Sequence, residues 1–214
     1  MSDDSNETNA LLREQAPDDP ERFAAMLEEY RPRLRRMVTL RLDPRLHGRI
    51  DPSDVIQETY LEASARLAEY LHKPTMPFFL WLRFLAGQKL VTLHRHHLGR
   101  QMRDAGREIS LYRGRLPEAS SAALAAQLLG HEPRPSEAAV RAELKIRLQE
   151  ALNSMDPLDR EILALRHFEQ LSLAETAQVL KLTESGACRR HMRALKRLKE
   201  ILSSMPGGLE NLLP

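Results

Sequence analysis

One cysteine, Cys188, is present among the 214 residues, and a single thiol excludes both a disulfide framework and a zinc site built from cysteines. Aromatic residues make up only 5% of the chain, and β-branched residues are sparse beside Leu, Ala, Arg and Glu. This composition disfavours a β-sandwich or barrel and favours an all-helical chain. No apolar run approaches the ~20 residues of a membrane span, and the polar first residues MSDDSNETNA do not form a secretory signal. We therefore expect a soluble, cytoplasmic protein with no membrane partner.

Charge is unevenly distributed along the chain, although the formal net charge is only +2. Residues 30–50, 71–107 and 181–202 carry net charges of +6, +6 and +5, whereas residues 1–29 and 51–70 carry −7 and −4. Basic blocks are typical of surfaces that bind nucleic acid or an acidic partner, but for any single block a solvated helix face explains the charge equally well. Two of the blocks coincide with the motifs described below. The block at residues 30–50 is compatible with either a DNA path or a protein-facing surface.

Helix start and stop signals divide the chain into two helical halves. Asp19-Pro20 and Asp51-Pro52 combine an N-cap with proline at the first helical position, and Pro32 is expected to kink or divide the first helix. Residues 106–136 are rich in Gly, Pro and Ser, which predicts a flexible linker between two small domains. Helices are predicted at about residues 19–42, 51–71, 78–98, 119–129, 136–155, 158–168, 172–180 and 184–202.

Residues 172–198 have the spacing of a helix-turn-helix motif. A short apolar helix is followed by the turn Lys181-Leu182-Thr183, where Thr183 is suited to cap a second, basic helix. The small side chain of Ala177 allows the two helices to approach closely. An ordinary helical hairpin with a charged outer face is the alternative. The net charge of +5 over residues 181–202 favours DNA binding instead, because cations near a recognition helix bind phosphates.

Two separate stretches resemble bacterial RNA polymerase sigma factors of the sigma-70 superfamily, in the small extracytoplasmic-function (ECF) group. Residues 151–198 (ALNSMDPLDREILALRHFEQLSLAETAQVLKLTESGACRRHMRALKRL) resemble region 4. The stretches DPSDVIQETYLEA (51–63) and PFFLWLRFLAGQKLVTLHRHH (77–97) resemble two helices of region 2. The chain departs from the family pattern at Lys181, at Gly186-Ala187-Cys188, at Gln88 and at Thr92. Because of these departures, the promoter sequence preference of the family does not carry over to this chain.

The resemblance implies an all-α chain of two small helical domains joined by a flexible linker. Residues 1–17 are then a flexible acidic tail, 18–105 region 2, 106–136 the linker, 137–205 region 4 and 206–214 a tail. The implied function is to bind core RNA polymerase and direct promoter recognition, DNA melting and transcription initiation. The implied partners are the polymerase β′ clamp and β flap, promoter DNA and an anti-sigma factor. A stand-alone helix-turn-helix regulator is the alternative, but it leaves the region 2 motifs unexplained.

The resemblance places three sets of site residues on this sequence. An acidic helix is expected to bind polymerase through Asp54, Gln57, Glu58, Tyr60 and Leu61. Region 2 is expected to bind the −10 element through Trp81, Arg83, Lys89, His94, Arg95, His96, Arg100 and Arg103. Region 4 is expected to bind the −35 element through Thr183, Ser185, Gly186, Cys188, Arg189, Arg190, Arg193, Lys196 and Arg197.

Several of these residues have a second interpretation. Trp81 recurs at helical spacing with Leu82 and Leu85, which favours the core over a base-stacking surface. The run His94-x-His96-His97 lacks the i, i+4 pair that places two imidazoles on one helix face, which disfavours a metal site. Cys188 fits a small groove-facing residue better than a redox sensor. We find no arrangement typical of a catalytic site, and we therefore expect a protein that is not an enzyme and needs no cofactor or metal.

Overall fold

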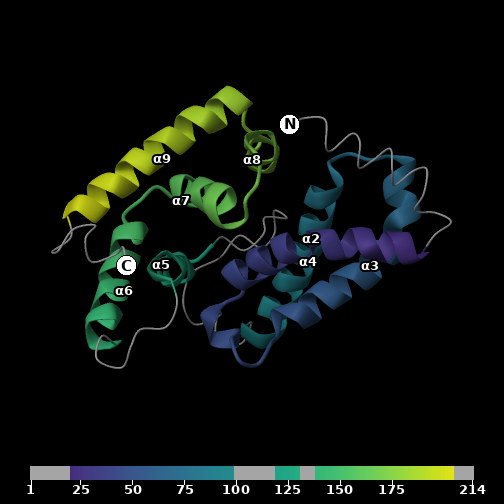
Figure 1. Cartoon of the computed structure of the whole chain (residues 1–214), viewed down its shortest axis with the longest axis horizontal. Coiled ribbons are helices and arrows are strands. Elements are labelled where there is room, and N and C mark those ends of the chain that lie inside the picture. Colours follow the sequence, from purple (N-terminus) through teal and green to yellow (C-terminus); the bar gives the residue numbers. More distant parts are fainter. Residues whose placement is uncertain (1–19, 99–118, 131–137, 205–214) are drawn as a thin grey trace. The chain divides into compact units, whose positions relative to one another are not determined.

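The structure is a computed structural model that describes residues 20–98, 119–130 and 138–204 (Figure 1). The chain divides into two compact units, with the boundary between Glu118 and Ala119. All the regular elements of the described residues are helical, which confirms the predicted fold class. The expected tails at 1–17 and 206–214, the Asp19 cap, and the predicted site residues Arg100 and Arg103 lie outside the described residues.

The first unit is built from three long helices that pack against one another (Figure 1): α2 (Pro20–Arg41), α3 (Pro52–His72) and α4 (Phe78–Leu98). A short 3-10 turn, η1 (Pro44–Leu46), follows α2. The side chain of Asp51 caps α3 by accepting a hydrogen bond of 2.8 Å from the backbone N–H of Ser53. The apolar faces predicted from helical spacing form the core, in which Leu34, Ile56 and Leu82 are fully buried.

Of the two predicted effects of Pro32, a kink or a division of the first helix, division is wrong, because α2 continues across it. Proline removes one helical hydrogen bond and normally disrupts a helix interior. Here Pro32 faces solvent, while Leu34, Met37 and Val38, within the next two turns of the helix, are completely buried. Packing of this apolar face holds the segment helical despite the missing N–H donor.

Most of the few aromatic residues gather in the first unit. The rings of Tyr70 and Trp81 are stacked with centroids 4.5 Å apart, and Phe78 contacts both. The Tyr70 hydroxyl donates a 2.9 Å hydrogen bond to the carbonyl of Met76, at the proline-rich loop before α4. Clustered aromatics contribute large buried areas, so this group holds α2, α3 and α4 together.

The second unit contains five helices and one π-helical turn among its described residues: α5 (Ser121–Leu129), α6 (Ala138–Asn153), α7 (Pro157–Leu163), η4 (Ala164–Phe168), α8 (Leu173–Leu180) and α9 (Glu184–Ser204). Helix α5 confirms the short helix predicted inside the linker. It packs on α6 and belongs to the second unit, so this part of the predicted linker is folded. Asp156 caps α7 through a 2.8 Å bond to the N–H of Leu158.

Candidate DNA-binding and docking surfaces

Helices α8 and α9 form the predicted helix-turn-helix. Ser172 and Glu175 form a reciprocal capping box at the start of α8, with hydrogen bonds of 3.1 and 2.7 Å. Thr183 caps α9 by accepting a 3.1 Å hydrogen bond from the N–H of Gly186. Ala177 on α8 and Ala187 on α9 are both buried where the helices pack. Small side chains at this crossing therefore allow the close approach that the sequence predicts.

The turn between α8 and α9 depends on Lys181 in the left-handed conformation, with φ 56° and ψ 43°. The N–H of Leu182 donates a 2.9 Å bond back to the carbonyl of Ala177. Glycine is the common residue at such a helix C-terminus, because a Cβ makes the left-handed region unfavourable. Lys181 thus replaces glycine without changing the turn.

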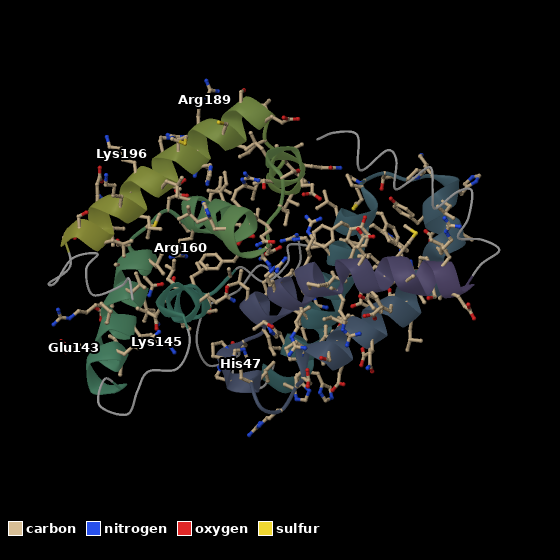
Figure 2. The ribbon with its side chains drawn as sticks, viewed as in Figure 1. His47, Glu143, Lys145, Arg160, Arg189 and Lys196 are labelled. Atoms are coloured by element: carbon tan, nitrogen blue, oxygen red, sulfur yellow. The ribbon has the colours of Figure 1, made fainter. Side chains whose placement is uncertain are left out.

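The outer face of α9 is exposed and cationic. Arg189 and Lys196 extend from the helix on the side away from α7 (Figure 2). Arg193 is also exposed, whereas Ala187, Ala194 and Ile201 on the opposite side are buried. The exposed members of the predicted −35 set are Thr183, Ser185, Cys188, Arg189, Arg193, Lys196 and Arg197, and Gly186 is half-buried. A helix with this face is able to enter the major groove and bind phosphates.

Arg190 belongs to the predicted −35 set, but its charge is used within the second unit. Its guanidinium lies 3.0 Å from Asp156 and 2.8 Å from Asp159, at the start of α7. The N–H of Leu158, together with Arg190, holds the pKa of Asp156 below its ordinary value. The expectation that Arg190 binds DNA is therefore unsupported by the geometry. The local sequence does not predict these ion pairs, because the two aspartates lie 31 and 34 residues before Arg190.

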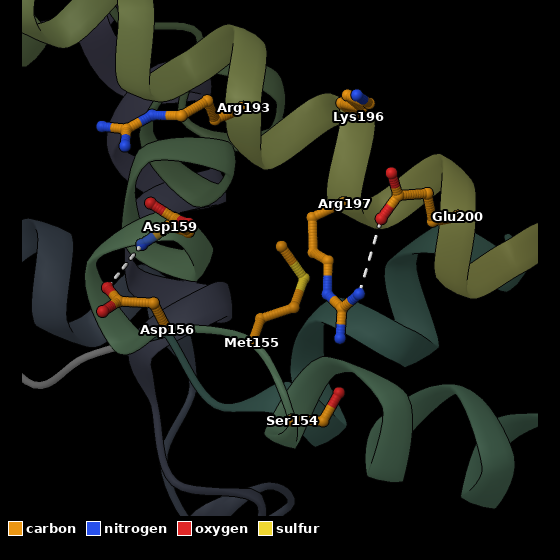
Figure 3. Close-up of a pocket in the computed structure, with 8 residues that line it drawn as sticks. All are labelled: Ser154, Met155, Asp156, Asp159, Arg193, Lys196, Arg197 and Glu200. Carbon is orange, nitrogen blue, oxygen red and sulfur yellow. Dashed lines mark hydrogen bonds and ion pairs between the residues drawn. The ribbon is translucent and has the colours of Figure 1, made fainter.

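Arg197 also has a partner of its own. It pairs with Glu200 at 3.4 Å and extends toward the loop between α6 and α7, where Met155 lies (Figure 3). A shallow pocket at this place is lined by Ser154, Met155, Asp156, Asp159, Arg193, Lys196, Arg197 and Glu200. Of these charged side chains, the acids come from α7 and from the last turns of α9.

Two histidines join α9 to the π-helical turn. The Nε2 atoms of His167 and His191 are 2.8 Å apart, so one ring donates a hydrogen bond to the other. Burial, followed by the nearby Arg166 charge, lowers the pKa of His167. Burial, then His167 and Arg166, lowers the pKa of His191. Both rings are thereby favoured in the neutral form that this hydrogen bond requires.

The acidic helix α3 exposes most of the predicted polymerase-binding residues. Asp54, Gln57 and Glu58 are exposed, and Leu61 is a large apolar side chain with 73% of its surface exposed. Tyr60 differs, because its hydroxyl donates a 2.5 Å hydrogen bond to the carbonyl of Leu27 on α2. Burial raises the pKa of Tyr60 to about 12. Tyr60 therefore joins two helices of the first unit and does not face outward.

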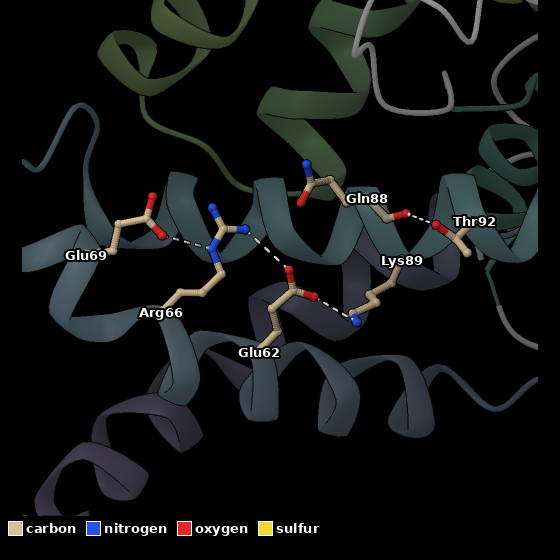
Figure 4. Close-up of polar contacts among 6 residues, drawn as sticks. All are labelled: Glu62, Arg66, Glu69, Gln88, Lys89 and Thr92. Atoms are coloured by element: carbon tan, nitrogen blue, oxygen red, sulfur yellow. Dashed lines mark hydrogen bonds and ion pairs between the residues drawn. The ribbon is translucent and has the colours of Figure 1, made fainter.

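Most of the predicted −10 residues on α4 make contacts inside the first unit. Trp81 and Arg83 are buried, with 6% and 4% of their surfaces exposed, so neither is available for DNA. Lys89 pairs with Glu62 of α3 at 2.7 Å, and Glu62 also pairs with Arg66 (Figure 4). Lys89 lowers the pKa of that Glu62 carboxyl. The burial of Trp81 confirms the prediction that it is a core residue.

The histidine run of α4 is split between two environments. His94 accepts a 3.2 Å hydrogen bond from the N–H of Asp43, at the end of α2, and burial lowers its pKa. Arg95 and His96 are exposed. Among the residues that the structure describes, no group of three or more His, Cys, Asp or Glu side chains is arranged to hold a metal ion. His94 stabilises the packing of α4 on α2.

An outer stripe on α4 consists of Gln88, Thr92 and Arg95, and of these only Arg95 belongs to the predicted −10 set. Gln88 and Thr92 are exposed and share a face with Arg95, and Thr92 donates a 3.0 Å hydrogen bond to the carbonyl of Gln88 (Figure 4). The i, i+4, i+7 spacing of these residues was a usable signal. They include the two α4 positions at which the sequence departs from the family pattern.

The basic block at residues 30–50 is largely used within the first unit. Arg41 is buried, and the guanidinium of Arg33 lies 3.6 Å from the centroid of the Phe79 ring. Arg31 pairs with Glu28 and Arg45 with Asp43. The N–H and side-chain bonds from Arg45 lower the pKa of Asp43. Four of the seven arginines of this block are thus engaged in packing or ion pairs within the first unit.

The fold and the cationic outer face of α9 define a helix-turn-helix DNA-binding protein. Residues 151–200 match the family model described as sigma-70, region 4. Two relatives from Mycobacterium bovis and Mycobacterium tuberculosis, both named ECF RNA polymerase sigma factor SigD, are 29% identical over 192 residues, which are 90% of this chain and 82% of each relative. The chain is thus similar to sigma factors of the extracytoplasmic-function group over most of its length, and its residues 151–200 match sigma-70 region 4.

A solved structure, that of CnrH in complex with the cytosolic domain of CnrY, is similar to this chain in fold. It has a TM-score of 0.51 and 20% sequence identity, over 92% of this chain and 98% of CnrH. This similarity supports the all-helical fold. None of the described helices is long and apolar enough to span a membrane.

Proposed function

We propose that this sigma factor docks on core RNA polymerase through α3 and directs it to promoters through α9 and the outer stripe of α4. The observation that carries the proposal is the exposed cationic face of α9, with Arg189, Arg193 and Lys196, on a complete helix-turn-helix. Such a face supplies the phosphate contacts that position a recognition helix at the −35 element. The polymerase supplies the chemistry in the cytoplasm, and the chain itself needs no catalytic activity.

The docking half of the proposal depends on α3. Its exposed acids complement a basic clamp surface, and Leu61 provides an apolar centre for the interface. For the −10 element, the outer stripe of Gln88, Thr92 and Arg95 replaces Trp81, Arg83 and Lys89 as the surface we propose. The relatives' family also implies an anti-sigma factor as a further protein partner.

The test is run-off transcription with core polymerase and a library of random promoters. We expect a specific set of promoters to be selected, and no selection when core polymerase is mixed with buffer instead. Leu61→Ala and the double variant Asp54→Arg, Gln57→Ala should each weaken binding to core polymerase by about tenfold or more, because they remove the apolar centre and the charge complementarity. Ala24→Arg, which adds a cation on an exposed position of α2, is the matched control. Normal core binding by both α3 variants contradicts the docking assignment.

A further inference from the structure

The outer face of α9 contains one large apolar side chain among its cations. Met192 has 60% of its surface exposed, and it is the only large hydrophobic residue on α9 that the described structure leaves exposed. Arg189 lies three residues before it and Lys196 four residues after it, so the three side chains share one face of the helix. Figure 2 shows Arg189 and Lys196 on the side of α9 that faces away from α7.

The packing of the second unit does not account for Met192. The buried stripe of α9 runs through Ala187, Ala194 and Ile201, on the other side of the helix. Single exposed apolar residues are common on protein surfaces and need no explanation by themselves. Met192 differs because its position is the centre of a cationic face that is directed at DNA. In the major groove, the apolar group displayed by the bases is the 5-methyl of thymine.

The neighbouring side chains leave this contact to Met192. Ser185 and Cys188, earlier on the same exposed surface, are small. Arg189 and Lys196 are long cations that reach phosphates or the acceptor edge of guanine. The unbranched thioether of methionine adapts to an irregular apolar surface better than a β-branched side chain does. We propose that Met192 is a specificity-determining residue that contacts a thymine 5-methyl group in the −35 element.

This inference rests on the proposed function, and the experiment separates the two. Holoenzyme is first assembled from core polymerase and the wild-type chain, and a promoter is selected from the random library. Each thymine of its −35 element is then replaced in turn by uracil, which lacks only the 5-methyl group. Affinity of holoenzyme for each substituted promoter is measured for the wild type, Met192→Ala and Met192→Leu. Failure to select any promoter contradicts the proposed function itself, whereas the responses to uracil bear on the role of Met192.

With wild-type holoenzyme, we expect uracil at one −35 position to weaken binding about fourfold, the loss expected for one buried methyl group. Met192→Ala should bind the thymine promoter about fourfold more weakly and show no further loss with uracil at that position. Met192→Leu should keep most of the discrimination, because it keeps an apolar surface. Equal thymine-to-uracil losses for wild type and Met192→Ala at every position overturn the proposal, as does a selected −35 element without thymine.

Two controls exclude indirect effects. Ile146→Ala removes another exposed apolar side chain, 58% exposed on α6, and should leave the uracil response unchanged. Thermal unfolding of Met192→Ala should match that of the wild type, because an exposed side chain contributes little to stability. A uracil response that changes equally in Ile146→Ala contradicts a specific role for Met192.

Discussion

The guanidinium of Arg190 lies between two carboxylates of α7, although its position on a basic recognition helix predicts a phosphate contact. Asp156 and Asp159 are paired with it at 3.0 and 2.8 Å, and its side chain is only 25% exposed. A cation held in this way orients α9 on α7. The residues that remain for DNA are those whose charges have no such use in the described fold, chiefly Arg189, Arg193 and Lys196.

Replacing Arg190 tests this division of roles. Arg190→Ala should lower the free energy of unfolding of the second unit by about 1 kcal/mol, because the partly buried Asp159 and the exposed Asp156 lose their shared partner. Arg193→Ala should leave stability unchanged. In holoenzyme binding to promoter DNA, Arg193→Ala should instead reduce the slope of log affinity against log salt by about 0.9, the value for one phosphate contact. Chemical denaturation and binding titrations at several salt concentrations check both results. A stable Arg190→Ala variant with a reduced slope contradicts the assignment.

The hydrogen bond between His167 and His191 makes the second unit sensitive to acid. Both pKa values are lowered from the ordinary 6.5, so the unfolded chain binds more protons than the folded chain below that pH. The stabilisation is therefore complete above about pH 6.5 and is lost as the pH falls toward the lowered values. The charges that face the pair are those of the two rings themselves and of Arg166.

We expect the thermal unfolding midpoint, measured by circular dichroism, to decrease as the pH is lowered from about 7.5 to about 5.5. His191→Gln should reduce this dependence, because glutamine does not titrate. His97→Gln, at an exposed position of α4, is the control and should leave the dependence as in the wild type. His94 is also buried with a lowered pKa, so part of the pH dependence should persist in His191→Gln. An unchanged pH dependence in His191→Gln contradicts the role of this pair.

At the scale of the element, the turn between α8 and α9 requires a backbone conformation that is unfavourable for the lysine found there. Lys181 adopts a left-handed conformation, which costs a residue with a Cβ about 1–2 kcal/mol. The hydrogen bonds that close the turn and the packing of α8 on α9 hold it there. The fold of the motif is thus robust to the loss of the usual glycine.

Replacing Lys181 by glycine should stabilise the second unit. Lys181→Gly should raise its free energy of unfolding by about 0.5–1 kcal/mol, because relief of the left-handed strain exceeds the added flexibility of the unfolded chain. Lys181→Ala removes the same charge without relieving the strain, and it should give no gain. Urea unfolding of the three proteins measures the difference. Equal stabilities of the glycine and alanine variants contradict the argument.

Elements of this protein were largely predictable from its sequence, because local signals determine where helices begin and end. The caps at Asp51 and Thr183 act as predicted. Pro32 was misjudged because its effect depends on tertiary packing. The rule that proline disrupts a helix takes account of the missing N–H. It takes no account of how deeply Leu34 and Met37 are buried on the same helix.

The site was less predictable than the elements, since residue type and position do not reveal distant partners. Lys89, His94 and Tyr60 were expected on binding surfaces, and each instead contacts another helix of the first unit. On α9, the pattern of exposed and buried side chains agreed more closely with the helical period than it did in the first unit. Met192 is absent from the predicted −35 set, because phosphate binding predicts cations and gives no signal for an exposed methionine.

At the scale of the whole molecule, a net charge of +2 results from surfaces of opposite sign. The exposed acids of α3 lie in the first unit, and the exposed cations of α9 lie in the second. A polymerase clamp and a DNA duplex attract opposite charges, so the exposed surface of α3 and that of α9 each have the sign that the proposed partner requires. Separate units also allow these two tasks to be changed independently by mutation.

The two units should unfold independently of one another, and the single tryptophan makes this measurable. Trp81 is stacked on Tyr70 in the core of the first unit, so its fluorescence reports on that unit alone. Arg190→Ala should shift the urea transition followed by circular dichroism to lower concentration while the fluorescence transition stays in place. Tyr70→Ala, which removes the stacked ring, should shift the fluorescence transition. Coincident shifts of both signals in Arg190→Ala contradict independent unfolding.

Cys188, the single thiol of the chain, is exposed on α9 one turn before Met192. This arrangement makes Cys188 a unique attachment point for a thiol-reactive dye on the surface proposed to contact the promoter. Modification there should be slowed when holoenzyme occupies a promoter and should proceed freely when the DNA is absent. The rate of alkylation at one atom then measures promoter occupancy directly, without any change to the rest of the chain.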